Sequence, residues 1–283
     1  MARDRISIGR GKARWLVGAA GVMLAAGCAP AAPANAPESG APTIVSLNPC
    51  IDAILVEVAP DQVLALSHYS RDPGSSSIPA AVAARFAVTG GTAEEIIALQ
   101  PDLVLASTFL PQPTRAALER AGLTVATFGS PTTVAESAAQ VRAVARLAKR
   151  EDAGAARARR IAAAPPQSAA PVDALLWQPG EIVAGEATLI AELMRQEGFA
   201  SHATARGLRQ ADHVTLEGVL ADPPQVLLVA GDAPGQRHPL LAEGAKATHI
   251  APFDPALLYC GGPTIPKART RLRAIRAEVE ARP

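Results

Sequence analysis

The sequence predicts an α/β fold with two lobes. From about residue 43, short apolar runs rich in Val, Ile and Leu alternate with segments of helical periodicity. Runs of this kind are typical of parallel sheets that helices cover on both faces. A long helical pattern near the middle of the chain separates two such alternating series. A weak internal repeat, with one copy on each side of that pattern, supports the division into two lobes.

The individual elements follow in a regular order. The alternation opens with segments 43–47, 52–58 and 63–66, and the later strands are expected at 103–106, 124–128, 174–177, 226–230 and 248–251. Helices are expected at 94–99, 113–121, 189–197 and 264–281. The repeat aligns EEIIALQPDLVLA at 94–106 with EGVLADPPQVLLV at 217–229. Each copy places a Glu at a helix start, a Pro at the turn and a buried strand after it.

The central helical pattern runs from about 133 to 163. It contains no Pro and no Gly except Gly154, and Pro165 and Pro166 end it. As one helix it would be roughly 45 Å long. We therefore predict a single rigid helix over 133–164 that bridges an N-terminal lobe at 43–132 and a C-terminal lobe at 165–283. The alternative is an ordinary surface helix of a single doubly wound domain.

The N-terminus carries an export signal. Five basic residues precede an apolar run at 15–27, which stops at Cys28 and is shorter than the roughly 20 residues that span a bilayer. This pattern predicts a lipoprotein signal at 1–28 with a lipidated Cys28, and the alternative is an ordinary secretory signal cut after Ala34 or Ala36. The Pro/Ala-rich segment 29–42 is expected to be an extended tether. Both alternatives predict a periplasmic protein, and lipidation would hold it at a membrane surface.

Composition excludes several classes of function. The formal net charge is +1 and no basic block is present, so nucleic-acid binding is not expected. Neither a phosphate-binding loop nor a nucleophile-elbow motif occurs, and the five His residues lack the spacing of a metal site. We therefore expect no resident cofactor or metal and no enzyme activity.

Cys50 and Cys260 remain after Cys28. Cys50 follows the first predicted strand, and Cys260 begins a Gly-Gly-Pro loop before the last helix, so both are expected near a cleft. In an exported protein an even pair can form a disulfide. Three alternatives stay open: a disulfide, two free thiols that pack, and a thiol that contacts ligand or acts as a nucleophile.

Aromatic residues are scarce at 3% of the chain, which makes their positions informative. Tyr69, Phe109, Trp177 and Tyr259 all stand at loop-facing ends of predicted elements. Together they could line one ligand slot, where flat rings supply contact area at low entropic cost. The alternative for each ring is that it fills the core of its lobe.

Three stretches carry a resemblance to a known family. They are TIVSLNPCIDAILVEVAPDQVLALSHYSRDP, GGTAEEIIALQPDLVLAS and, after the long helix, HVTLEGVLADPPQVLLVAGD. The chain from about 43 to 282 resembles the cobalamin and iron-chelate class of substrate-binding proteins of ABC importers. The resemblance implies two α/β lobes bridged by one α-helix, with a ligand cleft between lobes that open little. It also implies an ABC permease and its ATPase subunits as partners.

The resemblance assigns roles to individual residues. Glu94 and Glu217 match the surface Glu on each lobe that docks onto permease arginines, although an acidic residue at a helix start also has a capping role. Tyr69 matches a Tyr that contacts ligand, whereas Ser107 and Ala211 stand where Trp would be expected. The pocket is therefore expected to differ from that of the cobalamin binders in the family.

The expected ligand contacts follow from both lines of reasoning. They are Tyr69, Trp177 and Tyr259, with His68 and Arg71 as polar partners for propionate, amide or carboxylate groups. The expected ligand is cobalamin or another metal chelate, with heme or a siderophore as alternatives. The loops that carry Cys50 and Cys260 border the family's cleft, so a disulfide there could tie the lobes together. A different class of function, an exported enzyme using Cys50 as nucleophile or His68 as general base, is the competing hypothesis.

Overall fold

The structure is a computed structural model that describes residues 40–163, 170–244 and 248–282. The chain divides into a unit at Met1–Ala34 and a compact unit at Asn35–Pro283, which holds both lobes. The predicted lipoprotein signal at 1–28, with Cys28, lies outside the described residues, as does nearly all of the predicted tether at 29–42.

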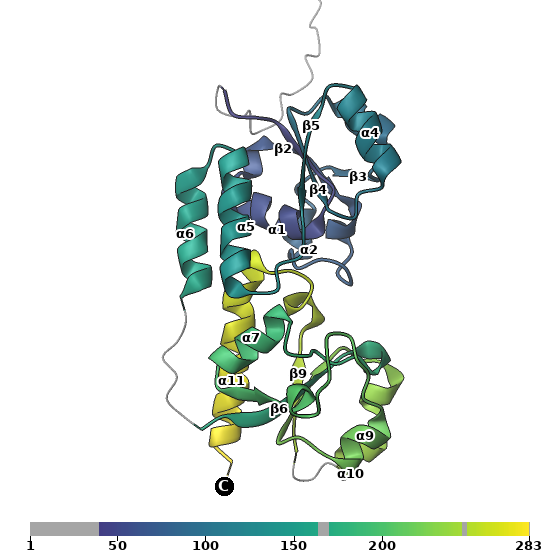
Figure 1. The fold of residues 1–283 in the computed structure, drawn as a ribbon, viewed down its shortest axis with the longest axis vertical. Helices are drawn as coiled ribbons and strands as arrows, with labels where there is room; N and C mark the ends of the chain where they lie inside the picture. Colours follow the sequence, from purple (N-terminus) through teal and green to yellow (C-terminus); the bar gives the residue numbers. More distant parts are fainter. Residues whose placement is uncertain (1–39, 164–169, 245–247, 283) are drawn as a thin grey trace, which may run out of the picture. The chain divides into compact units, whose positions relative to one another are not determined.

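The first lobe is built on a five-stranded sheet (Figure 1). Every strand pair in it is parallel, and the strand order is β3-β2-β1-β4-β5. The strands are β1 (Ile44–Ser46), β2 (Val63–Ser67), β3 (Val88–Thr89), β4 (Leu103–Ser107) and β5 (Thr124–Phe128). The helices of this lobe are α1 (Pro49–Val58), α2 (Ala80–Ala83), α3 (Ala93–Leu99) and α4 (Gln112–Arg120), with a short 3-10 turn, η2 (His68–Arg71), after β2.

The second lobe repeats this plan with a four-stranded parallel sheet in the order β7-β6-β8-β9. Its strands are β6 (Val172–Trp177), β7 (Phe199–Ser201), β8 (Val226–Ala230) and β9 (His249–Phe253). Its helices are α7 (Leu189–Gln196), α8 (His202–Ala205), α9 (Leu216–Ala221), α10 (Pro239–Gly244) and α11 (Ile265–Glu280), with the 3-10 turn η6 (Gly262–Thr264) before α11. The predicted fold class of two α/β lobes is thereby confirmed.

Capping residues in the sequence mark the starts of several helices. A Thr stands directly before four helices, and its side chain accepts a backbone N–H from the first turn of the helix that follows. These caps are Thr92 before α3, Thr133 before the helix that begins at Val134, Thr188 before α7 and Thr215 before α9. At α1, Asn48 does the same for Cys50 N–H, and Pro49 occupies the first helical position. These caps explain why the predicted starts of these elements lie close to the observed ones.

The prediction of one bridging helix over 133–164 is wrong. The structure has two helices, α5 (Val134–Leu147) and α6 (Glu151–Ala162), which lie side by side as a hairpin (Figure 1). Lys149 has a φ of 53°, in the left-handed region. Arg150 N–H donates to Ala145 O at 2.7 Å and Lys149 N–H to Arg146 O at 3.0 Å, which is a Schellman motif with Lys at the left-handed position.

Gly154 makes the hairpin possible. A Cβ at this position would lie 2.2 Å from the Cβ of Ala145, so only glycine lets α6 approach α5 this closely. The single glycine in the helical pattern was therefore the available signal for a close helix crossing. Because Lys can continue a helix, the sequence alone did not mark the break at Lys149.

The two lobes are not joined by a single bridging helix but share one continuous apolar core. It extends from Ile44 and Leu103 in the first sheet to Val226 and Phe253 in the second. Residues from α1, α5, α7 and α11 fill the space between them: Ile54, Val141, Leu193, Ile265 and Leu272. Bending the lobes apart would expose part of this core, so the seam between them resists opening.

A buried arginine reinforces that seam. Arg269 of α11 is 1% exposed and donates to the carbonyl of Ile161 at 2.7 Å and to that of Ala163, and thereby caps the end of α6. Its guanidinium also bonds Gln196 and lies 3.6 Å from the buried Glu197, both in or next to α7. One side chain therefore joins three helices.

The edge strands β3 and β7 did not stand out in the sequence. They have two and three residues and lie at the ends of their sheets, where too few residues alternate to produce a pattern. Within the described part of the chain, no helix is long and apolar enough to cross a bilayer.

Candidate functional site

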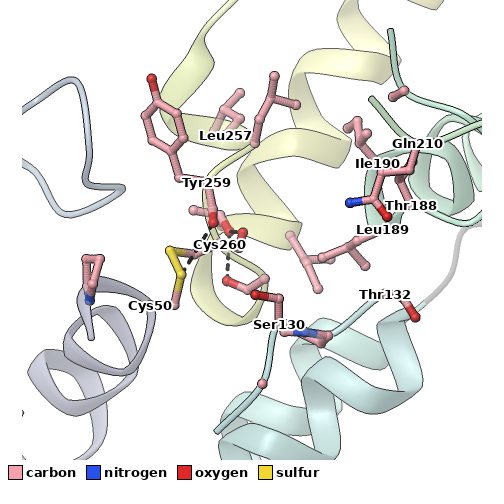
Figure 2. A pocket seen from close by; sticks show the side chains of 18 of the residues that line it. Cys50, Ser130, Thr132, Thr188, Leu189, Ile190, Gln210, Leu257, Tyr259 and Cys260 are labelled. Carbon is pink, nitrogen blue, oxygen red and sulfur yellow. Dashed lines mark hydrogen bonds between the residues drawn. A yellow bond between two sulfur atoms is a disulfide. The ribbon is translucent and has the colours of Figure 1, made fainter. Parts of the chain in front are cut away.

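A cavity of about 670 Å³ opens between the lobes (Figure 2). It lies next to the carboxyl ends of β1, β4, β5 and β6. In open parallel sheets this is the edge where ligands bind. Its volume is within the usual range for small-molecule sites. Residues from both lobes and from the segment before α11 line it, so a ligand there would contact both halves of the protein at once.

The first-lobe wall consists of the start of α1 and the turn η2. Asn48 contributes as the cap of α1, Cys50 from the first turn of that helix, Tyr69 from η2 and Ser107 from the end of β4. The loop at 129–132, which leads from β5 into α5, continues this wall.

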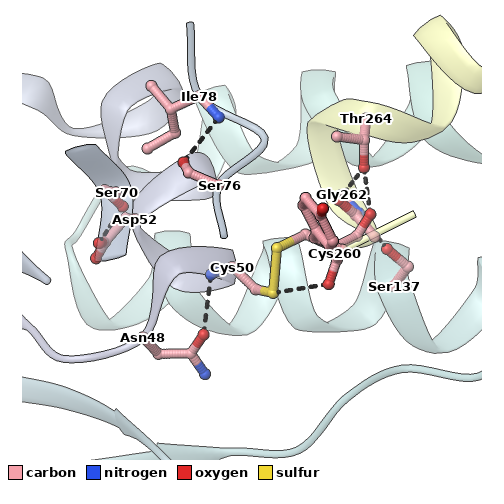
Figure 3. The surroundings of a disulfide bond; sticks show 12 residues. Asn48, Cys50, Asp52, Ser70, Ser76, Ile78, Ser137, Cys260, Gly262 and Thr264 are labelled. Atoms are coloured by element: carbon pink, nitrogen blue, oxygen red, sulfur yellow. Dashed lines mark hydrogen bonds between the residues drawn. A yellow bond between two sulfur atoms is a disulfide. The ribbon is translucent and has the colours of Figure 1, made fainter. Parts of the chain in front are cut away.

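A disulfide between Cys50 and Cys260 lies at the cavity (Figure 3). The two Cα atoms are 5.1 Å apart although the residues are 210 positions apart in sequence. The bond joins the first turn of α1 to the loop that follows β9, so it ties the first lobe to the segment that returns from the second. Of the three alternatives for these cysteines, the structure has the disulfide, and Cys50 therefore presents no thiolate.

Glycines let the segment after Cys260 fit between the lobes. A Cβ at Gly261 would lie 2.5 Å from Ser137 Oγ and 3.1 Å from Leu189, and Gly262 has a φ of +63°. Gly262 N–H donates to Ser137 Oγ at 2.6 Å (Figure 3). The sequence Cys-Gly-Gly thus places Tyr259 and the disulfide at the cavity because no larger residue fits.

A buried carboxyl group organises the first-lobe wall from behind. Asp52 of α1 is fully buried and accepts Ser67 N–H at 2.9 Å and Ser70 Oγ–H at 2.6 Å, one on either side of Tyr69. Its other oxygen has no partner among the described residues. Burial raises the pKa of Asp52 to about 7, against the lowering effect of the hydrogen bonds from Ser70 and from the Ser67 amide.

The second-lobe wall is mainly apolar. Ile182, Leu189 and Ile190 line it, and its polar side chains are Gln178, Thr188 and Gln210. Figure 2 shows Leu189, Ile190, Thr188 and Gln210 on this side of the cavity. A Cβ at Gly185 would lie 2.3 Å from the backbone carbon of Arg209, so this glycine lets the segment that carries Gln210 pack against the loop after β6.

Two of the five predicted ligand contacts line the cavity. Tyr69 and Tyr259 are 50% and 41% exposed, and they reach it from the first lobe and from the segment before α11. Ser107 and Ala211, the positions where the resemblance placed Trp, also line the cavity.

Trp177 requires a correction. Its indole is 1% exposed in the core of the second lobe, and Nε1–H donates to Val214 O at 2.8 Å. The alternation of strand β6 directs this ring away from the cavity into the lobe. The predicted ligand contact is therefore a core residue.

His68 and Arg71 do not line the cavity either. The His68 ring packs against Tyr69 with ring centroids 4.0 Å apart, and its Nδ1 lies 3.3 Å from Thr89 O. Arg71 donates to Phe86 O at 2.7 Å. Both stabilise the η2 turn that presents Tyr69, so their contribution to the site is structural. Phe109 is 84% exposed and lies outside the cavity as well.

Glu94 and Glu217 occupy equivalent places. Each is the exposed second residue of its helix, α3 or α9, directly after a Thr cap and Ala or Leu. Each helix leads into a strand, β4 or β8, that pairs with the first strand of its lobe. Hydrogen bonds from its own backbone amide and from Thr215 lower the pKa of Glu217. Both carboxylates lie outside the cavity.

Sequence reasoning missed the polar groups of the cavity: Asn48, Ser130, Thr132, Gln178, Thr188 and Gln210. A signal was present for three of them. Asn48, Ser130 and Gln178 closely follow strands, and the carboxyl ends of parallel strands face the ligand edge of a sheet. Gln210 had no such signal because a long loop brings it there. Within residues 40–163, 170–244 and 248–282, no group of three His, Cys, Asp or Glu side chains could hold a metal ion.

Comparison with known proteins supplies an independent line of evidence. Residues 44–248 match the family described as Periplasmic binding protein. A comparison with curated protein sequences gives no match.

Several solved structures share the fold. The chain is similar to the periplasmic heme-binding protein BhuT in complex with two hemes, with a TM-score of 0.64 and 23% identity over 86% of this chain and 100% of BhuT. It is similar to the periplasmic heme-binding protein HutB of Vibrio cholerae, with a TM-score of 0.66 and 18% identity over 83% and 98% of the two chains. For the periplasmic vitamin B12-binding protein BtuF of Vibrio cholerae the TM-score is 0.62 and the identity 19%, over 86% and 99%.

Proposed function

Because the chain belongs to the periplasmic binding protein family, we propose that it is the exported receptor of an ABC importer and captures a metal chelate between its lobes. The observation that carries this proposal is the cavity of about 670 Å³, which residues of both lobes line. The chelate is a corrinoid such as cobalamin or a ferric complex, with heme or a siderophore as alternatives. Similar folds that bind heme and vitamin B12 make both ligands reasonable candidates.

The family is one of binding proteins, and the site is suited to binding. The polar side chains Tyr69, Gln178, Gln210 and Tyr259 face the cavity without a hydrogen-bond partner among the described residues. Groups of this kind orient a ligand by hydrogen bonding. A cleft that binds without chemistry needs no activated nucleophile, and the energy for transport would come from the ATPase subunits of the importer.

Delivery requires a contact with the permease. In this proposal Glu94 and Glu217 are the two docking carboxylates, because they are exposed, equivalent and one to a lobe. Lipidation of Cys28 would keep the receptor at the membrane surface on the periplasmic side.

Calorimetric titration of the exported protein with cyanocobalamin, hemin and a set of ferric siderophores tests the binding step. We expect saturable binding of one of these chelates and its recovery unchanged. The exposed Ser130→Trp variant, which fills part of the cavity, should abolish binding, whereas Ala156→Trp on the outer face of α6 should not. Chemical conversion of the ligand, or binding that Ser130→Trp leaves intact, would contradict the proposal.

A transport assay tests the docking step separately. Replacing Glu94 and Glu217 together by Arg should abolish uptake and leave ligand affinity nearly unchanged, since both carboxylates lie outside the cavity. A matched Glu119→Arg variant, at an exposed carboxylate on α4, should transport normally. A large loss of affinity in the double variant would place these residues elsewhere in the mechanism.

A further inference from the structure

The described residues that line the cavity include no ionised side chain. Among the described residues that line it there is no Asp, Glu, Lys, Arg or His. Its polar groups are the amides of Asn48, Gln178 and Gln210, the phenols of Tyr69 and Tyr259, and several Ser and Thr hydroxyls. The two sulfur atoms are bonded to each other. The site is thus polar and yet neutral.

The neutral groups lie on both walls and are free to bond a ligand. Gln178 and Gln210 of the second lobe have no side-chain partner among the described residues. Across the cavity, Asn48 uses its Oδ1 to cap α1, which leaves its amide N–H groups available (Figure 3). The amides of Gln178 and Gln210 can both donate and accept and that of Asn48 can donate, so a ligand that carries amide groups can bond to both walls.

The basic residues nearest in sequence are engaged or directed elsewhere. Arg71, two residues after Tyr69, donates to Phe86 O. Arg209, next to Gln210, is exposed, and its side chain is absent from the cavity lining. A carboxylate enclosed in the cavity would therefore lose its hydration without gaining a cation, which is strongly unfavourable.

We propose that the cavity selects an uncharged, amide-bearing ligand and discriminates against carboxylate-bearing ones. This inference rests on the proposed function and narrows it. Among metal chelates, a corrinoid whose periphery carries neutral amides fits, whereas a porphyrin with propionates or a hydroxycarboxylate siderophore does not. Apolar residues such as Leu189 and Ile190 would pack against the face of the macrocycle, and the amide side chains of the cavity would form hydrogen bonds with the groups at its edge.

A matched ligand pair tests the selection. Dicyanocobinamide carries amides, and dicyanocobyrinic acid has the same macrocycle and metal with carboxylates in their place. We expect the acid to bind at least about a hundredfold more weakly, because each enclosed carboxylate is unpaired. Affinity for the amide form should change little between about 0.05 and about 0.5 M salt, since no charge pair contributes.

Variants at Gln210 sharpen the test. Gln210→Arg should weaken binding of the amide ligand and strengthen binding of the acid, because it supplies the missing cation. Gln112→Arg, at an exposed position on α4 outside the cavity, should change neither. Gln210 is exposed, so Gln210→Arg should fold normally, and its melting temperature checks this.

The possible outcomes distinguish a failure of the ligand selection from a failure of the receptor function. Equal or tighter binding of the acid, or of hemin, would overturn the selection and leave the receptor function standing. Failure of every corrinoid, porphyrin and siderophore to bind would overturn the proposed function and this inference with it.

Discussion

The first-lobe wall of the cavity is held by a covalent bond and a buried carboxyl group, whereas the second-lobe wall is held by apolar packing. On the first side, the disulfide fixes the start of α1, and Asp52 accepts hydrogen bonds on both sides of Tyr69. On the second side, Leu193 of α7 is buried in the common core and also borders the cavity. The first-lobe wall should therefore respond to redox state and pH. The second-lobe wall should respond to changes in the volume of its buried side chains.

Removal of the disulfide should have the largest effect. The bond closes a loop of more than two hundred residues, and disulfides of this kind stabilise by roughly 3–5 kcal/mol. Chemical denaturation of the Cys50→Ala/Cys260→Ala variant should show a loss of this size. Dithiothreitol should produce the same loss in the unaltered protein and none in the variant. Thiols that react without reductant in the native protein would contradict the disulfide itself.

Truncation of the second wall should follow in size. Leu193 is 2% exposed, and Leu193→Ala should lower the free energy of unfolding by about 3 kcal/mol through lost burial and a new void. This loss should be the same at pH 5 and pH 8 and with or without reductant. Leu240→Ala, at a half-exposed position of the same lobe, is the control and should cost far less. A pH-dependent loss at Leu193 would erase the distinction between the walls.

The buried carboxyl should make stability fall as pH rises. The folded-state pKa of Asp52 is about 7 and its ordinary value is 3.8, so the folded protein retains a proton that the unfolded chain has released. Its stabilising effect is complete below the ordinary pKa and is lost as pH rises through about 7. Within this range the free energy of unfolding should fall by about 1.4 kcal/mol for each pH unit.

Denaturation across this pH range checks the prediction. Asp52→Asn should lack the decline between acid and neutral pH, whereas Asp152→Asn, at an exposed carboxylate of α6, should retain it. The comparison uses the slope with pH, because a buried Asn can be destabilising at every pH. An unchanged slope in Asp52→Asn would assign the decline to other groups.

The smallest effect is expected at Ser70. Its hydroxyl donates to Asp52 Oδ2 at 2.6 Å, so Ser70→Ala should cost about 1–2 kcal/mol. This bond also lowers the pKa of Asp52, and its loss should move the pH-dependent decline to higher pH. A carbon-13 NMR titration of the Asp52 carboxyl would measure that shift directly. A shift to lower pH would contradict the role given to Ser70.

Some aromatic residues of the predicted site were placed correctly from the sequence, and one was not. Tyr69 and Tyr259 stand in loops that follow recognisable elements, and both line the cavity. Trp177 ends a recognisable strand, but the alternation of side chains along β6 directs it into the core. Whether a strand-end aromatic faces a ligand or its own lobe depends on sheet register, which one sequence does not reveal.

The predicted bridging helix is a second case in which tertiary contacts decided what the local sequence pattern did not. The pattern over 133–163 is helical throughout, and the structure is helical over 134–147 and 151–162, with a break at 148–150. Lys149 adopts the left-handed conformation because α6 gains packing against α5, with Gly154 at the crossing. A local propensity for helix was therefore overridden by tertiary contact at one residue.

The sequence by itself determined the α/β alternation, most strand positions, the capped helix starts and the equivalence of Glu94 and Glu217, because periodicity, caps and turns are local properties of the chain. Only the tertiary structure decided that Cys50 and Cys260 meet, that the central pattern folds into a hairpin and that the described residues lining the cavity carry no charge. Each of these depends on residues distant in sequence. Their proximity is fixed by how the two lobes pack on a shared core, and no local pattern encodes that packing.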